Sequence, residues 1–253
     1  MNARKKILFL LLSFALMGST ALADTGSRVR VFLAGDSTMQ DVDHDKNPDW
    51  GWGQVFPRYF DENVEIVNLA RGGRSTRTFL EEGRWETLIG RAGEGDYIII
   101  QFGHNDGARD KPERYTSPED YRKNLIRFVT EAREKGAIPI LLTPVMRRNF
   151  DGNGEFVDRH GVYPSLVKEV AGEMTVTFID LQEKSKWLII NHGVEGSKKI
   201  FMNVAPGEHP CCPEGRSDNT HFSEYGAMKV AGLVVEGLKE VKATPLADHL
   251  LIR

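Results

Sequence analysis

The chain has 253 residues, of which 40% are hydrophobic and 27% are charged, and it contains 25 Gly and 11 Pro. These values are ordinary for a globular protein and exclude a collagen-like, disordered or coiled-coil chain. The formal net charge of −3 and the lack of a long basic run argue against nucleic acid as a partner. The two cysteines are too few for a disulfide framework or a four-thiolate zinc site.

Residues 1–23 have the three parts of an export signal. Residues 4–6 are basic, residues 7–17 are apolar apart from Ser13, and residues 21–23 give the small-x-small cleavage pattern Ala-Leu-Ala. This apolar stretch is well short of the roughly 20 residues that span a bilayer, and no later segment is apolar enough to do so. We therefore predict a cleaved signal peptide over 1–23 and a mature, secreted or periplasmic chain over 24–253 that has no membrane anchor.

Short apolar runs recur along the mature chain at intervals of about 35 residues. Each run is nearly continuous, as expected of parallel strands that are buried on both faces, and each interval leaves room for a crossover helix. We predict a single α/β domain over 24–253, a three-layer α/β/α sandwich around a five-stranded parallel sheet. The predicted strands are Val29–Leu33, Val64–Asn68, Tyr97–Gln101, Ile138–Leu142 and Val176–Asp180.

Helix signals lie between the predicted strands. Ser117 is a typical N-cap, Pro118 suits the first helical position, and Gly136 is placed as the C-cap of a helix that ends near Lys135. Further helices are predicted over 164–172, over 181–190, and after Ser223. The chain shows no repeat, linker or composition shift that would divide it.

Polar residues suited to acyl transfer follow the predicted strands. Ser37 follows the first strand, Gly73 the second and Asn105 the third, while Asp218 and His221 precede the last helix. Ligands of an open parallel sheet bind beyond the carboxyl ends of its strands, so these residues converge on one edge. They supply a nucleophile, oxyanion donors and an oriented base. The Pro and Gly residues at 213 and 215 predict a loop around the Asp/His pair.

Four sequence blocks in this order resemble the SGNH, or GDSL, hydrolase superfamily. They are Gly35-Asp36-Ser37, Gly73, Gly103-His104-Asn105-Asp106 and Asp218-x-x-His221. Residues 71–79, 143–148, 160–164 and 218–222 are similar to the rhamnogalacturonan acetylesterase branch of that superfamily. The resemblance implies a flavodoxin-like SGNH fold and removal of acetyl groups from pectin backbone sugars.

The resulting functional prediction is an exported serine esterase that deacetylates carbohydrate, with pectic rhamnogalacturonan as the acetylated polysaccharide or oligosaccharide substrate. Ser37 is the nucleophile, His221 the base and Asp218 its orienting carboxylate. The N–H groups of Ser37 and Gly73 and the amide of Asn105 form the oxyanion hole. An acetyl-enzyme forms and is hydrolysed, which requires no metal and no organic cofactor.

Two alternative functions remain open. A lipase, thioesterase or lysophospholipase of the same superfamily would use the same four blocks, and a non-catalytic carbohydrate-binding protein is the other class. An α/β-hydrolase is excluded, because its Gly-x-Ser-x-Gly elbow is absent: the sequence around Ser37 ends in Met39, where that motif needs a glycine.

Several polar residues have structural interpretations. Ser37 alone could be a helix cap, and Ser75 is predicted to be one. Asp36 is expected to anchor its loop through backbone hydrogen bonds, and His104 is expected to have a structural role near the site. The roles of His160 and His209 stay open.

An arginine cluster follows the second strand, and two interpretations of it are open. Arg74, Arg77 and Arg84 could bind the carboxylates of galacturonate, for which a planar guanidinium is suited. Alternatively the cluster is a solvated helix face, in which Arg77 pairs with Glu81 four residues later.

The two cysteines, Cys211 and Cys212, are adjacent. Across a trans peptide their Cα atoms are about 3.8 Å apart, below the usual disulfide range. A bridge would therefore be strained, but export to an oxidising compartment favours one.

Overall fold

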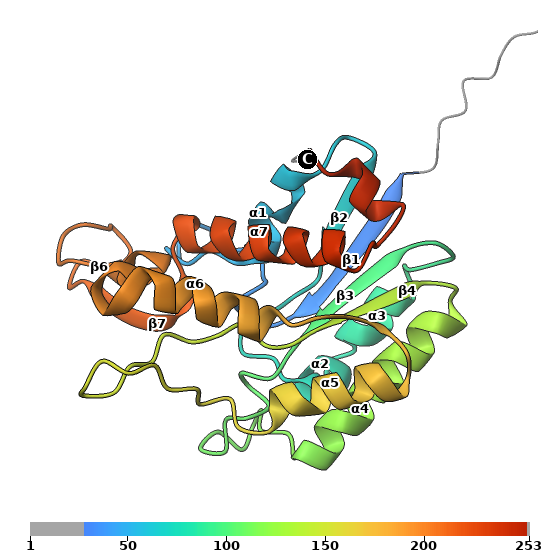
Figure 1. Ribbon diagram of the computed structural model, residues 1–253, viewed down its shortest axis with the longest axis horizontal. Coiled ribbons are helices and arrows are strands. Elements are labelled where there is room, and N and C mark those ends of the chain that lie inside the picture. The colour runs from blue at the N-terminus through green and yellow to red at the C-terminus, as the bar shows by residue number, and fades with distance from the viewer. Residues whose placement is uncertain (1–27, 252–253) are drawn as a thin grey trace, which may run out of the picture.

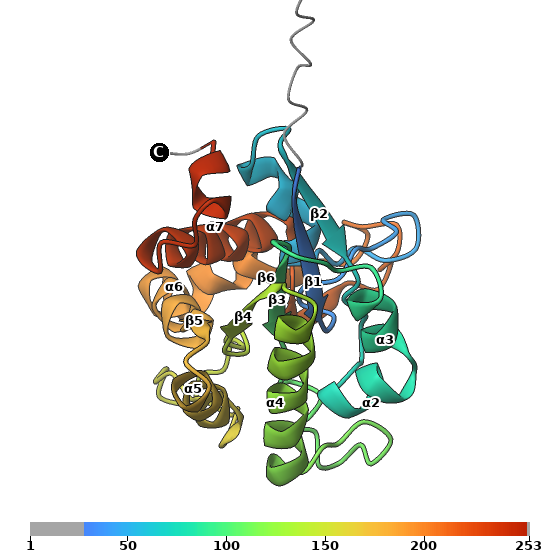
Figure 2. The same cartoon turned by 90° about the vertical axis from the view of Figure 1, so that its right-hand side faces the viewer.

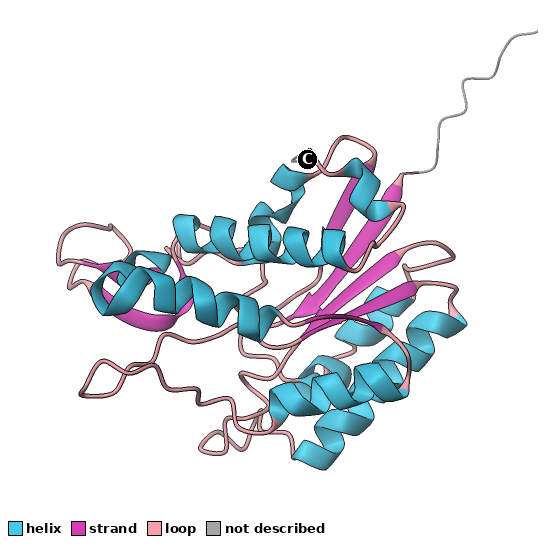
Figure 3. Ribbon diagram, viewed as in Figure 1, coloured by secondary structure: helices cyan, strands magenta, loops and turns pink. Residues whose placement is uncertain are grey.

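The computed structural model describes residues 28–251, so the predicted signal peptide lies outside the described residues. Five parallel strands form the central sheet in the order β2-β1-β3-β4-β5 (Figure 3). All five predicted strands are confirmed, although the first extends two residues further and the last is shorter. The strands are β1 Val29–Gly35, β2 Val64–Asn68, β3 Tyr97–Gln101, β4 Ile138–Leu142 and β5 Thr177–Ile179.

Helices cover both faces of the sheet, as the prediction of a three-layer sandwich requires (Figures 1 and 2). Successive residues of β1 point to opposite faces, so Val31 and Leu33 join one buried cluster while Phe32 and Ala34 join the other. The first cluster packs under α1 Trp52–Val55, α6 Leu181–Gly196 and α7 Glu224–Glu240. The second packs under α2 Thr76–Glu81, α3 Arg84–Ile89, α4 Pro118–Glu134 and α5 Tyr163–Glu173.

The long helices begin close to the predicted residues, and α4 and α5 also end close to them. Helix α6 instead continues past the predicted end at residue 190 to Gly196, through a kink at Gly193. The Ser117 hydroxyl accepts the N–H of Asp120 at 3.1 Å, and Gly136 has a φ of +73° just beyond the end of α4. The bounds of the short helices were not predicted, because four to six residues are too few to show a helical period, and only the start of α2 had a signal, the cap at Ser75. Three short 3₁₀ helices complete the described elements: η1 Phe56–Tyr59, η2 Ser197–Ile200 and η3 Leu246–His249.

A second, two-stranded sheet lies away from the parallel one (Figure 1). Strands β6 Phe201–Val204 and β7 Arg216–Phe222 pair antiparallel. The prediction of a loop around residue 218 was therefore wrong: the turn residues Pro213 and Gly215 lie in the connection between the two strands. Phe222 is fully buried, and its carbonyl accepts the N–H of Trp50 at 3.0 Å, which joins the hairpin to the segment after β1.

Helix α7 approaches the chain before β6 so closely that it needs a glycine. A Cβ added at Gly226 would lie 1.8 Å from the carbonyl oxygen of Ile200, whereas a Cβ at Gly232 in the same helix would first meet the Tyr59 hydroxyl at 3.4 Å. The backbone at Ile200 leads directly into β6 and cannot yield without moving the hairpin.

We therefore expect Gly226→Ala to lower the free energy of unfolding by about 3 kcal/mol, at the upper end of overpacking costs. Gly232→Ala is the matched control, and it should raise the free energy of unfolding by up to about 1 kcal/mol because Ala is the better helix former. Urea unfolding of both variants checks the pair. Equal effects of the two substitutions would contradict the close approach.

Candidate active site

Ser37 follows β1 in a turn that is organised by its neighbour Asp36. Asp36 is 0% exposed, and its Oδ1 accepts both the N–H and the hydroxyl of Thr38 at 2.9 Å. Its Oδ2 lies 3.1 Å from Nδ1 of His104. Burial alone would raise the pKa of Asp36, but the charge of His104 and the hydrogen bonds hold that pKa below its usual range. Asp36 thus anchors the turn as an ionised carboxylate.

His104 supports the turn rather than the reaction itself. Its Nε2 lies 2.7 Å from the carbonyl oxygen of Val145, while its Nδ1 faces Asp36. These two contacts fix the orientation of the ring between the turn after β1 and the chain after β4. The predicted structural role of His104 agrees with these contacts.

The structure brings together the three residues that the sequence predicted to act as nucleophile, base and orienting acid. Nε2 of His221 lies 3.0 Å from the Ser37 hydroxyl, and Nδ1 of His221 lies 2.8 Å from Oδ2 of Asp218. The serine comes from the end of β1, and the other two from β7. This continuous hydrogen-bonded chain can deprotonate the hydroxyl for attack on an ester carbonyl.

Asp218 is held from several sides. Its Oδ1 accepts the backbone N–H groups of Thr220 at 2.7 Å and His221 at 2.9 Å. Its Oδ2 also receives a 2.6 Å ion pair from Arg216, whose guanidinium in turn lies 2.8 Å from the buried Asp49. The sequence analysis missed Arg216 and Asp49. The only sequence signal for Arg216 is its position two residues before Asp218, on the same face of a strand.

This environment sets the proton affinities of the pair. Burial alone would raise the pKa of Asp218, but the hydrogen bonds from His221 and the contact with Arg216 hold that pKa well below its usual range. Burial alone would lower the pKa of His221, but the hydrogen bond to Asp218 and the charges of Asp218 and Asp49 raise it above its usual range. The imidazolium that forms after proton transfer is therefore stabilised.

The three residues predicted to bind the oxyanion line the same cavity as the Ser37 hydroxyl. Within residues 28–251, no hydrogen bond uses the backbone N–H of Ser37 or that of Gly73. Gly73 has a positive φ, +80°, which orients its peptide in a way that other residues rarely adopt. One N–H of the Asn105 amide donates to the carbonyl of Arg74 at 2.9 Å, which leaves the second N–H for a ligand.

These groups line a cavity of about 390 Å³. Its side chains are polar or charged throughout, and its remaining lining comes from the glycines of the turn after β2. Among residues 28–251, no group of His, Cys, Asp and Glu side chains could hold a metal ion. The lining residues are Ser37, Gln40, Asn47, Asp49, Gly72, Gly73, His104, Asn105, Lys111, Arg114, Arg147, Thr220 and His221.

The arginines that the sequence offered for substrate binding are engaged with carboxylates. Arg74 and Arg84 both contact Glu82, at 2.9 and 2.6 Å, and Arg77 contacts Glu81 at 3.1 Å. These contacts agree with the second interpretation of the cluster, a solvated helix face whose arginines pair with glutamates. None of the three arginines lines the cavity that holds Ser37.

Two smaller expectations are settled here. The Ser75 hydroxyl accepts the N–H of Thr78 in a capping box, so its predicted role as a cap of a short helix is confirmed.

Cys211 and Cys212 are both free cysteines, so the expected bridge between them was wrong. The strain of closing a disulfide between adjacent residues outweighs the oxidising environment that favoured it.

An α/β/α sandwich with a Ser-His-Asp chain at the carboxyl end of its sheet defines a serine hydrolase. Residues 33–227 match the family model of the GDSL-like lipase/acylhydrolase family. The chain belongs to this family, and it is a carboxylic ester hydrolase.

Two curated relatives come from Bacillus subtilis (strain 168). The chain is 47% identical over 225 residues to rhamnogalacturonan acetylesterase RhgT, covering 89% of this chain and 95% of the relative. It is 39% identical over 222 residues to the probable rhamnogalacturonan acetylesterase YesY, covering 87% of this chain and 97% of the relative.

Solved structures share the fold. The protein YxiM of Bacillus subtilis superposes with a TM-score of 0.73 at 25% identity, covering 87% of this chain, which spans only 58% of that protein. The acetylxylan esterase Axe2 of Geobacillus stearothermophilus superposes with a TM-score of 0.60 at 20% identity, covering 85% and 95%.

Removing the Asn105 amide should lower kcat far more than it changes KM, because the oxyanion charge appears only in the transition state. Losing one such donor costs about 2.7–4 kcal/mol, so Asn105→Ala should reduce kcat by roughly 10²–10³. Steady-state kinetics on p-nitrophenyl acetate test this, with the exposed Asn191→Ala of α6 as control. A change confined to KM would place Asn105 in ground-state binding instead.

The pH dependence of kcat/KM should report the raised pKa of His221. Only the neutral ring can accept the Ser37 proton, so activity is lost as the pH falls through that pKa. Asp218→Asn removes the contacts that raise the pKa, so the acidic limb should move to lower pH while the rate drops by on the order of 10⁴.

Arg216→Gln should move the same limb in the opposite direction. The arginine is a cation beside His221 and lowers its pKa, so its loss raises that pKa further. Profiles of kcat/KM against pH for the wild type and both variants check these signs. Shifts of both variants in one direction would contradict the electrostatic arrangement.

Proposed function

We propose that this protein is an exported carbohydrate esterase that removes O-acetyl groups from pectic rhamnogalacturonan. The observation that carries the proposal is the hydrogen-bonded chain from Ser37 to Asp218, which opens into a cavity lined by polar and charged side chains. The names of RhgT and YesY support the choice of substrate. The export-signal pattern of residues 1–23 supports a secreted or periplasmic location, where such a polymer would be met.

The proposed reaction follows from the positions of the groups. Ser37 attacks the acetyl carbonyl while His221 takes its proton, and the N–H groups of Ser37 and Gly73 with the Asn105 amide bind the oxyanion. His221 then protonates the departing sugar hydroxyl, which leaves an acetyl group on Ser37. Water, deprotonated by His221, hydrolyses this acetyl-enzyme and restores the site. These steps call for no metal or organic cofactor.

The lining of the cavity favours a small acyl group on a hydrophilic substrate over a lipid. A lipase or lysophospholipase must hold a long acyl chain against apolar side chains, and the cavity offers none. Within residues 28–251, no helix is long and apolar enough to cross a bilayer. A protein that only binds carbohydrate would not need the hydrogen-bonded arrangement of Ser37, His221 and Asp218.

The proposal is tested by measuring acetate release from acetylated pectic rhamnogalacturonan and from acetylated xylan, and fatty-acid release from a phospholipid. We expect acetate from the pectic rhamnogalacturonan above all and no release of fatty acid. Ser37→Ala should abolish the release without changing the melting temperature, whereas Ser75→Ala should keep the activity, because that hydroxyl only caps α2. Near-wild-type turnover in Ser37→Ala, or a preference for the phospholipid, would overturn the proposal.

A further inference from the structure

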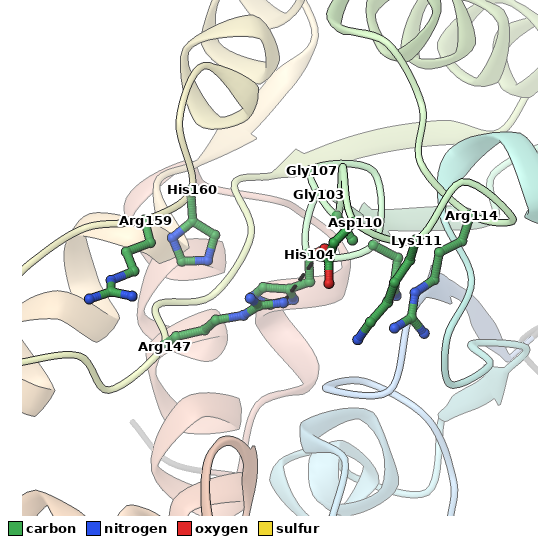
Figure 4. Close-up of a pocket in the computed structure, with 11 residues that line it drawn as sticks. Gly103, His104, Gly107, Asp110, Lys111, Arg114, Arg147, Arg159 and His160 are labelled. Carbon is green, nitrogen blue, oxygen red and sulfur yellow. Dashed lines mark hydrogen bonds between the residues drawn. The ribbon is translucent and has the colours of Figure 1, made fainter.

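A second cavity, of about 220 Å³, has the lining residues drawn in Figure 4, and it adjoins the cavity that contains Ser37. It lies between the loop after β3 and the loop between β4 and α5. The two cavities share part of their walls, so a ligand in one is in reach of the other. The shared residues are His104, Asn105, Lys111, Arg114 and Arg147.

The second cavity has an excess of positive charge. Lys111, Arg114, Arg147 and Arg159 line it, against the single acid Asp110. Figure 4 shows Arg159 and His160 on one side, Lys111 and Arg114 on the other, and Arg147 between them. This concentration of cations occurs in a chain whose formal net charge is −3.

These cations lack the carboxylate partners that the arginines after β2 have. Arg147 donates only to the carbonyl of His104, at 3.3 Å, and its Nε is buried without a partner in the described chain. The Nε of Arg114 is likewise buried without a hydrogen bond, and its nearest carboxylate, Glu113, is 3.9 Å away. Lys111 is exposed and makes no ion pair or side-chain hydrogen bond within residues 28–251. An anionic ligand would supply the missing acceptors.

His160 adds an unused acceptor to the same wall. It is only 7% exposed, and Oδ1 of Asp158 lies 2.8 Å from its Nδ1. A carboxylate only accepts, so Nδ1 carries the proton and Nε2 keeps its lone pair. This Nε2 is buried and has no partner in the described chain. Burial also lowers the pKa of His160, which keeps the ring neutral.

We propose that this second cavity is a subsite for a uronate residue of the acetylated polysaccharide. Arg147, Arg114 and Lys111 would bind its carboxylate, and a sugar hydroxyl would donate a hydrogen bond to Nε2 of His160. The inference builds on the proposed function and names the groups that select an acidic sugar. It differs from the cluster that the sequence suggested, because Arg74, Arg77 and Arg84 already bind glutamates. The shared wall places this sugar next to the ester that Ser37 attacks.

The test compares two forms of one acetylated rhamnogalacturonan, with its carboxylates free or converted to methyl esters. The wild type should have a lower KM for the free form. Lys111→Gln and Arg147→Gln should each raise the KM for the free form about tenfold, as expected for one charge-assisted hydrogen bond, and hardly change it for the methyl ester. On p-nitrophenyl acetate, which carries no carboxylate, each variant should change kcat/KM far less than it does on the free polymer.

Matched controls remove the same charge elsewhere. Arg127→Gln and Lys123→Gln break exposed ion pairs on α4, where neither residue lines a cavity described here, and they should leave both KM values unchanged. His160→Phe should raise the KM for both forms of the polymer equally, because a hydroxyl contact does not depend on the carboxylate. Equal losses on the free and esterified polymers in Lys111→Gln and Arg147→Gln would overturn the subsite.

Inhibition separates this inference from the proposed function. Unacetylated digalacturonate should inhibit hydrolysis of p-nitrophenyl acetate by the wild type, its dimethyl ester should inhibit far less, and Lys111→Gln should lose the difference. If the acetylated polymer releases no acetate but this inhibition pattern holds, the substrate assignment fails and the subsite stands. If acetate is released but digalacturonate and its ester inhibit equally, the subsite fails and the esterase activity stands.

Discussion

A fully buried carboxylate must obtain all its hydrogen bonds from the protein, and the position of Ser37 depends on how Asp36 meets this requirement. Asp36 accepts the backbone N–H of Thr38, and this contact closes the tight turn that holds Ser37. Its other oxygen contacts His104, whose second ring nitrogen contacts a backbone carbonyl after β4. The Thr38 hydroxyl also accepts from Gln101 at 2.8 Å, at the end of β3. One buried charge therefore connects the ends of three neighbouring strands and fixes the nucleophile among them.

Sequence reasoning succeeded where a residue's role follows from its place relative to a strand. Strands buried on both faces appear as continuous apolar runs, and Ser37, Gly73 and Asn105 were found because each follows one. Strand β7 was not predicted, because it pairs with β6 in an irregular register and its sequence shows no alternation of apolar and polar residues. Sequence reasoning also could not decide between the two roles of Arg74, whose partner Glu82 is eight residues away and meets it only through the path of the turn and α2.

The arginines near the site fall into two groups that composition cannot distinguish. Those after β2 are neutralised by Glu81 and Glu82, so they stiffen a solvated helix and its turn. Those around the second cavity keep their charge with few partners, at the cost of mutual repulsion and partial burial. Burial lowers the pKa of Arg147, the charge of Asp36 opposes that shift, and the nearby Arg114 adds to it. A ligand carboxylate between these cations would offset their mutual repulsion, as the proposed subsite requires.

The hairpin β6–β7 carries both Asp218 and His221, whereas Ser37 belongs to the parallel sheet, 184 residues earlier than the histidine. A ribosome must therefore have released nearly the whole described chain before nucleophile and base can meet. A fragment that stops before Arg216 would contain all five parallel strands and the serine, yet it could not deprotonate that serine. Hydrolytic competence is thus a property of the finished molecule, and turnover reports whether the β6–β7 hairpin has docked against the parallel sheet.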